Sequence, residues 1–130
     1  MKIYLGADFQ RRRELRRHAE TLRSLGHEVV SSWLWTAIPD SDYRSKWEDC
    51  AQEDMERIRE ADVCVFFTEE PNTKSRGGRH VEYGYALSTC AWVVVIGWVE
   101  SQFYTLADCT FKSLGDFLEW LESNDCPFSN

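Results

Sequence analysis

The sequence is poor in the residues that mark several specialised classes of protein. It contains 3 Pro, 7 Gly and 3 His in 130 residues, and it has no low-complexity tract or internal repeat. Basic residues are outnumbered, with 15 Lys and Arg against 22 Asp and Glu, so the net charge is −7. A general nucleic-acid surface needs an excess of Lys and Arg, and nucleic acid is therefore not an expected partner. A small anionic ligand remains compatible, because local charge can oppose the net charge.

Patterned cysteine and histidine are also lacking. The 5 Cys are odd in number and include no Cys-x-x-Cys pair, and none stands at metal-ligand spacing from a His. We therefore expect reduced thiols in a cytoplasmic protein, with no metal and no other cofactor. The N-terminus has no signal-peptide pattern. The longest uncharged stretch, 83–99, is interrupted by Gly84 and Gly97 and is interpreted as a helix followed by a strand rather than a membrane span.

What the sequence does contain is an alternation of strand and helix patterns. It is 43% hydrophobic and 14% aromatic, enough for a substantial core. Apolar runs predict strands at 2–5, 27–32, 62–68, 92–97 and, more weakly, 109–111. Helical periodicity predicts helices at 11–25, 43–60, 79–90 and 114–121. This order predicts an α/β fold: one domain over 1–130, with a doubly wound parallel sheet of about five strands, flavodoxin-like. Ligands of such sheets bind beyond the carboxyl ends of the strands.

A lone carboxylate lies near that edge. Glu82 is the only charged residue between His80 and Val99, and it follows the glycines at 77 and 78. We expect it in the first turn of a helix, where backbone N–H groups and the helix dipole favour an anion. An ionised Glu82 is competent as a nucleophile. The alternative is an ordinary helix-start residue.

A second carboxylate interrupts an apolar helical stripe. Trp47, Ala51, Ile58 and Ala61 recur at helical spacing, and Asp54 lies among them. The stripe should face the sheet, so Asp54 should point inward. An inward Asp either bonds a structural partner or lines a cavity.

The ordered set of segments resembles the nucleoside 2-deoxyribosyltransferase family, including the related deoxynucleoside 5′-monophosphate N-glycosidases. The similarity covers most of the chain. In order, the matching segments are 3–7, 25–30, Asp54 with the junction 58–63, and 78–87. The resemblance implies that Glu82 is a nucleophile attacking the anomeric carbon and that Asp54 bonds the sugar hydroxyls and orients Glu82. It further implies a homodimer or larger homo-oligomer with shared active sites.

The resemblance also implies substrate contacts, and one position departs from it. Gly6, Ala7, Asp8 and Phe9 match a loop that contacts the base or the sugar, and Asp8 is a candidate acid for the leaving base. Six residues before Glu82, the transferases carry an acidic residue and the nucleotide hydrolases often a Ser, whereas this chain has Arg76. The residues expected to bind a 5′-phosphate, since Arg matches phosphate geometry, are Ser75, Arg76, Gly78 and Arg79. Solvated arginines are the alternative.

The predicted function is therefore cleavage or exchange of an N-glycosidic bond in a (deoxy)nucleoside or its 5′-monophosphate, through a covalent glycosyl-Glu82 intermediate. The enzyme is expected to be a nucleoside 2-deoxyribosyltransferase or a nucleotide N-glycosidase, and the sequence leaves the choice open. A competing hypothesis is a nucleotide-binding or sensing module of TIR-like type without turnover. An FMN-binding flavodoxin is disfavoured, because 6–9 lacks a phosphate-cradling Ser/Thr/Gly loop.

Overall fold

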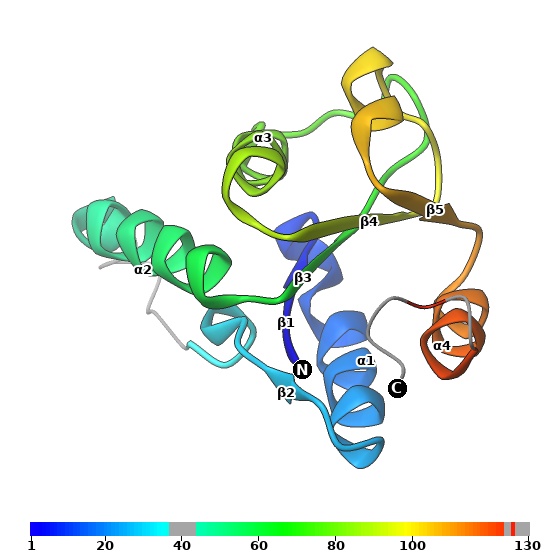
Figure 1. The fold of residues 1–130 in the computed structure, drawn as a ribbon. Helices are drawn as coiled ribbons and strands as arrows, with labels where there is room; N and C mark the ends of the chain where they lie inside the picture. Colours follow the sequence, from blue (N-terminus) through cyan, green and yellow to red (C-terminus); the bar gives the residue numbers. More distant parts are fainter. Residues whose placement is uncertain (37–43, 124–125, 127–130) are drawn as a thin grey trace.

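The centre of the fold is a parallel sheet of five strands. The computed structural model describes residues 1–36, 44–123 and 126 (Figure 1). The strands are β1 (Lys2–Gly6), β2 (Glu28–Val29), β3 (Val63–Phe67), β4 (Trp92–Ile96) and β5 (Cys109–Phe111). Their order is β2-β1-β3-β4-β5, and every pair is parallel. This confirms the predicted flavodoxin-like arrangement, with the strand order reversing between β1 and β3.

Helices cover both faces of the sheet (Figure 1). Helices α1 (Arg12–Ser24) and α4 (Leu114–Glu122) lie on one face, while α2 (Trp47–Glu60) and α3 (Gly78–Thr89) lie on the other. Short 3-10 turns connect these elements: η1 (Phe9–Arg11), η2 (Ser32–Leu34), η3 (Arg44–Lys46) and η4 (Gln102–Leu106). Across the described part of the chain, each helix is too short or too polar to cross a bilayer.

Alternating strand residues supply two separate cores. On β1, Ile3 and Leu5 join the cluster under α1 and α4, whereas Tyr4 joins the cluster under α2 and α3. Every residue of β3 is buried, as expected for a central strand covered on both faces. The rings of Tyr4, Phe66 and Tyr83 pack together between α3 and the sheet. The ring centroids of Tyr4 and Phe66 are 6.3 Å apart, and those of Phe66 and Tyr83 are 5.5 Å apart. This aromatic core sets the height of α3 above the sheet.

Three local expectations were wrong. The strand predicted at 27–32 is paired only at Glu28–Val29, because the chain turns into η2 after Ser31. The helix predicted from 43 begins as the 3-10 turn Arg44–Lys46, and residue 43 itself lies outside the described residues. The inward stripe of α2 holds only for its second half.

In that second half Ile58 and Ala61 are buried, but Trp47 is 45% exposed and Ala51 is exposed. The 14 residues of α2 span about 21 Å at 1.5 Å per residue, more than the five residues of β1, the strand that α2 contacts, so the start of α2 extends past the sheet (Figure 1). The overhanging half of α2 therefore has no sheet to pack against.

Candidate functional site

A cavity of about 870 Å³ opens at the carboxyl ends of β1, β2 and β3. It lies at the point where the strand order reverses, which is where open α/β sheets bind ligands. Nine of the ten residues predicted from the sequence line it: Ala7, Asp8, Phe9, Asp54, Ser75, Arg76, Gly78, Arg79 and Glu82. The structure thus brings together residues from four segments, although it does not assign their roles.

The tenth residue, Gly6, lies behind the cavity wall against Glu82. A Cβ atom built on Gly6 would stand 3.5 Å from Oε2 of Glu82 and 2.6 Å from two ring carbons of Phe66. The ring contact is too short for any real side chain, so β1 must carry glycine at this point. Absence of a side chain at Gly6 leaves the space that the Glu82 carboxyl group occupies.

Glu82 and Asp54 are neighbouring carboxyl groups in the cavity lining, and each perturbs the pKa of the other. Burial and the nearby Asp54 raise the pKa of Glu82 from 4.5 to about 8. Burial also raises the pKa of Asp54 from 3.8 to about 6, while the hydrogen bond to Glu82 partly opposes this increase. Two adjacent carboxylates cannot both ionise cheaply, so the pair holds one proton between these two values.

This protonation state corrects the sequence-based expectation of an ionised Glu82. Helix α3 begins at Gly78, so Glu82 is its fifth residue and lies beyond the first turn. Stabilisation of an anion by the helix dipole fades within that turn, whereas burial and Asp54 act directly on the carboxyl group. The proton of the pair therefore resides mainly on Glu82 near neutral pH.

Tyr4 is a member of this site that sequence analysis missed. Its side chain is fully buried, and its hydroxyl has no partner at full hydrogen-bond geometry within the described residues. Burial and the neighbouring carboxyls of Glu82 and Asp54 raise the pKa of Tyr4. The hydroxyl therefore stays protonated and is available to donate to Glu82 when that carboxyl loses its proton.

One wall of the cavity is aromatic. Phe9 and Trp33 have ring centroids 6.3 Å apart, and the Arg12 guanidinium lies 4.6 Å from the Phe9 centroid. The indole N–H of Trp33 donates to the Leu5 carbonyl oxygen at 2.8 Å, which fixes the orientation of the ring. A flat heterocycle can stack on such a wall. Sequence analysis missed Trp33, because its position depends on how η2 folds back over β1.

Polar groups border this wall. The Asp8 carboxylate accepts a hydrogen bond from the backbone N–H of Gln10 at 2.9 Å, which caps η1 and keeps the carboxylate at the cavity. Ser32 donates to the Glu53 carboxylate at 3.0 Å, joining η2 to α2. Glu53 itself lines the cavity, with a side chain that is 45% exposed.

The opposite end of the cavity is basic. Exposed Lys74, Ser75 and Arg76 line it from the loop between β3 and α3. Gly77 has φ of +91°, a left-handed conformation that suits glycine, and its N–H bonds the Ser75 hydroxyl at 3.1 Å. This turn directs the loop into the start of α3.

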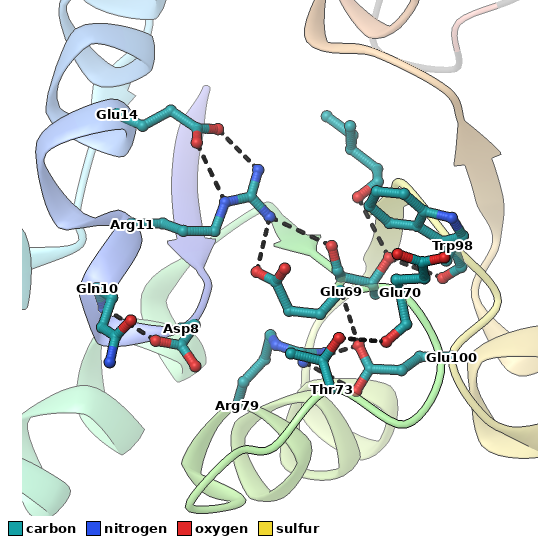
Figure 2. A network of polar contacts seen from close by, with 12 residues as sticks. Asp8, Gln10, Arg11, Glu14, Glu69, Glu70, Thr73, Arg79, Trp98 and Glu100 are labelled. Carbon is teal, nitrogen blue, oxygen red and sulfur yellow. Dashed lines mark hydrogen bonds and ion pairs between the residues drawn. The ribbon is translucent and has the colours of Figure 1, made fainter.

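Arg79 differs from these exposed residues, because it is 4% exposed and already ion-paired. Its guanidinium donates to both oxygens of Glu100, at 2.8 and 3.0 Å (Figure 2). It also donates to the Tyr104 hydroxyl at 2.8 Å. Only Nε of the guanidinium has no partner within the described residues. The charge that the sequence assigned to phosphate binding is thus largely neutralised by Glu100. Among the described residues, no cluster of three or more His, Cys, Asp or Glu is suited to hold a metal.

Two solved structures with the same fold are named as enzymes that act on nucleosides or nucleotides. A 2-deoxyribosyltransferase from Bacillus psychrosaccharolyticus superposes with a TM-score of 0.72 at 19% identity, covering 90% of each chain. The CMP N-glycosidase of Clostridium botulinum gives a TM-score of 0.57 at 17% identity, covering 93% of this chain and 98% of that one. This chain has the 2-deoxyribosyltransferase fold.

A conserved protein from Enterococcus faecalis V583 is also similar, with a TM-score of 0.68 at 20% identity over 92% of this chain and 95% of that one. The sequence matches no protein-family model and no curated protein. At these identities, the structural similarity shows a shared fold and not a shared activity.

The raised pKa of Glu82 predicts that Glu82→Gln stabilises the protein, and increasingly so as the pH rises. The folded protein binds the Glu82 proton more tightly than the unfolded chain, so stability is lost between pH 4.5 and about 8 as this carboxyl ionises. Glutamine is neutral throughout. Urea unfolding should give a gain on the order of 2 kcal/mol at about pH 8.5 and little at about pH 5.

The matched control is Glu119→Gln, which changes an exposed carboxylate on α4. Its effect on the free energy of unfolding should be small and independent of pH. A gain from Glu82→Gln that is constant or shrinks with rising pH would contradict the assigned protonation of the pair.

Proposed function

We propose that this protein cleaves or exchanges the N-glycosidic bond of a (deoxy)nucleoside or its 5′-monophosphate through a covalent glycosyl-Glu82 intermediate. The observation that carries the proposal is the Glu82–Asp54 carboxyl pair in a cavity whose two ends suit the two ends of a nucleotide. Phe9 and Trp33 provide a stacking wall for the base. Lys74 and Arg76 provide positive charge for a phosphate.

In the first step, an oxygen of ionised Glu82 attacks the anomeric carbon as the carbon–nitrogen bond breaks. The bonding electrons leave on the base nitrogen, which takes up a proton. In the second step, water or another base attacks the same carbon and releases Glu82, giving net retention. A protonated Glu82 cannot start this sequence, so the pair must first move its proton from Glu82 to Asp54 or to solvent.

The contact between the two carboxyl groups limits what Asp54 can do. Because Asp54 and Glu82 are close enough to perturb each other's pKa, both would lie on the same side of a bound sugar ring. Asp54 therefore does not protonate a base leaving from the opposite face. Its proposed role is to bond the sugar hydroxyls, to take the shared proton and to orient Glu82. Asp8, at the base end of the cavity, remains the candidate acid for the leaving base.

A 5′-monophosphate is favoured over a plain nucleoside by the basic end of the cavity. Lys74, Ser75 and Arg76 follow one another on the loop, and Gly78 begins α3 beside them. Backbone N–H groups at a helix start and flexible cationic side chains together form a phosphate site. The two named structural neighbours, a deoxyribosyltransferase and a CMP N-glycosidase, are compatible with both substrate classes.

The direct test is to incubate the protein with deoxynucleosides and their 5′-monophosphates, with and without a free acceptor base, and to quantify free and exchanged base by chromatography. Release without an acceptor identifies a hydrolase, and exchange that requires the acceptor identifies a transferase. Glu82→Ala should lower the rate at least about 1,000-fold. Glu56→Ala, which removes an exposed carboxylate from α2, is the matched control and should remain active.

Absence of reaction with every donor would contradict the proposal, as would a Glu82→Ala variant of normal activity. Saturable nucleotide binding by a wild type that releases no base would indicate the sensing module instead.

The same proposal includes a homodimer or a larger homo-oligomer in a reducing cytoplasm. It is supported by the overhanging start of α2, where Trp47 and Ala51 are exposed next to Cys50 and Asp54 of the cavity wall. The reducing compartment is supported by the odd number of cysteines and the lack of a Cys-x-x-Cys pair.

Sedimentation velocity should show a species larger than the 15.2 kDa chain. Trp47→Glu should shift that species toward the monomer, because it places a charge in the apolar contact. Glu56→Ala serves again as the control. A wild type that sediments as a monomer at all concentrations would contradict this part of the proposal.

A further inference from the structure

The loop between β3 and α3 is held at both ends by one buried side chain. Glu100, in the segment between β4 and β5, has a side chain only 8% exposed. Its Oε1 accepts the backbone N–H of Glu69 at 2.7 Å, where the loop begins. The same carboxylate accepts two hydrogen bonds from Arg79, just after the loop ends, at 2.8 and 3.0 Å (Figure 2).

Further contacts stabilise both ends of this arrangement. At the β3 end, Arg11 donates to the Thr68 carbonyl at 3.2 Å and to the Glu69 carboxylate at 3.1 Å, and it also pairs with Glu14 on α1 (Figure 2). At the α3 end, Tyr104 accepts from Arg79 at 2.8 Å. Two helices and the segment 98–107 are thereby connected to a single loop.

The contacts around Glu100 form a closed ring. The Tyr104 hydroxyl accepts from Arg79 at 2.8 Å and lies 2.7 Å from Nδ1 of His80. Nε2 of the same His80 ring lies 3.3 Å from Glu100. Each polar atom in the ring has a matching partner, apart from Nε of Arg79.

We propose that Glu100 is a positioning residue that fixes the loop 69–78, and with it Lys74 and Arg76, at a set distance from Glu82. The loop itself has little internal support: Thr73 bonds back to Glu70, and Asn72 adopts a left-handed φ of 73°. In this arrangement Arg79 connects Glu100 to the start of α3 and is not a flexible phosphate ligand. The consequence for catalysis rests on the proposed function, whereas the constraint on the loop does not.

Glu100→Asp is the most informative variant, because it keeps the charge opposite buried Arg79 but withdraws the carboxylate by one methylene. The shortened side chain cannot serve both the Glu69 N–H and Arg79 in their present positions. Amide hydrogen exchange should quicken about tenfold or more at Glu69, Thr73 and Gly77, whose amides are hydrogen-bonded, while the amides of β4 keep their wild-type rates. Glu100→Gln should act in the same direction.

Tyr104→Phe is the matched control within the same ring. It removes the hydroxyl that contacts Arg79 and His80 but keeps Glu100 and the Tyr83 ring stack, whose centroids are 4.2 Å apart. Exchange at Glu69 should then remain slow. Exchange unchanged in both Glu100 variants would overturn the proposal, and so would an increase spread evenly over the whole chain, which would show only a loss of stability.

The functional readout is the separation of KM from kcat. With a 5′-monophosphate, Glu100→Asp should lower kcat/KM about 10- to 100-fold, mainly through KM, because Lys74 and Arg76 no longer hold the phosphate at a fixed distance. With the corresponding nucleoside the loss should be smaller. Equal losses for both substrates would overturn the positioning role. A wild type that releases no base fails the proposed function alone, since hydrogen exchange still decides the role of Glu100.

Discussion

The single proton shared by Glu82 and Asp54 is the constraint around which this site is organised. Two carboxyl groups from different helices meet beneath a cavity, and burial makes the doubly ionised pair expensive. Folding must therefore overcome the cost of bringing them together, and the aromatic core of Tyr4, Phe66 and Tyr83 provides apolar burial directly below. Gly6 provides the space, since any side chain there would collide with Phe66.

In the proposed mechanism, the energetic cost of ionising the buried pair also makes Glu82 more reactive. A carboxylate that is stable in water is a weak nucleophile, whereas one held in a partly buried site is poised to react once its proton is moved. Tyr4 adds a protonated hydroxyl on the inner side, and Asp54 supplies a nearby base on the outer side. The proton can thus leave Glu82 without passing through bulk water.

Rigidity around the pair comes from polar contacts that are distant in sequence. Arg79 is buried, yet it is paired with Glu100, 21 residues away, rather than exposed to a ligand. Through Glu100 and Arg11, the loop that carries Lys74 and Arg76 is connected to α1 and to the segment 98–107 (Figure 2). The cationic end of the cavity is therefore anchored relative to its carboxyl end. Under the proposed function, a nucleotide spans the two.

The order of strands and helices could be predicted from sequence, because alternating apolar runs and helical stripes reflect local geometry. Asp54 was found in the same way, from its place between Trp47 and Ile58. Exposure of Trp47 could not be found, because it depends on how far the start of α2 extends past the sheet.

Contacts between side chains on different helices, strands and loops could not be predicted from the spacing of residues in the sequence. The contact between Glu100 and Arg79 forms only when the sheet assembles. The same is true of the position of Trp33 in the cavity wall. The ionisation of Glu82 was predicted wrongly for a related reason. Its position on α3 was visible, but the neighbouring Asp54 and the depth of burial were not, and these two outweigh the helix dipole.

The most direct test of Glu82 as a nucleophile is to find the covalent intermediate. Enzyme mixed with an equal amount of deoxynucleoside 5′-monophosphate and quenched in acid within milliseconds should gain the mass of the sugar phosphate without its base. Peptide mapping should place the added mass on Glu82, and Glu82→Gln should show none. Release of base with no adduct at any time, or an adduct on another residue, would contradict the assignment of Glu82.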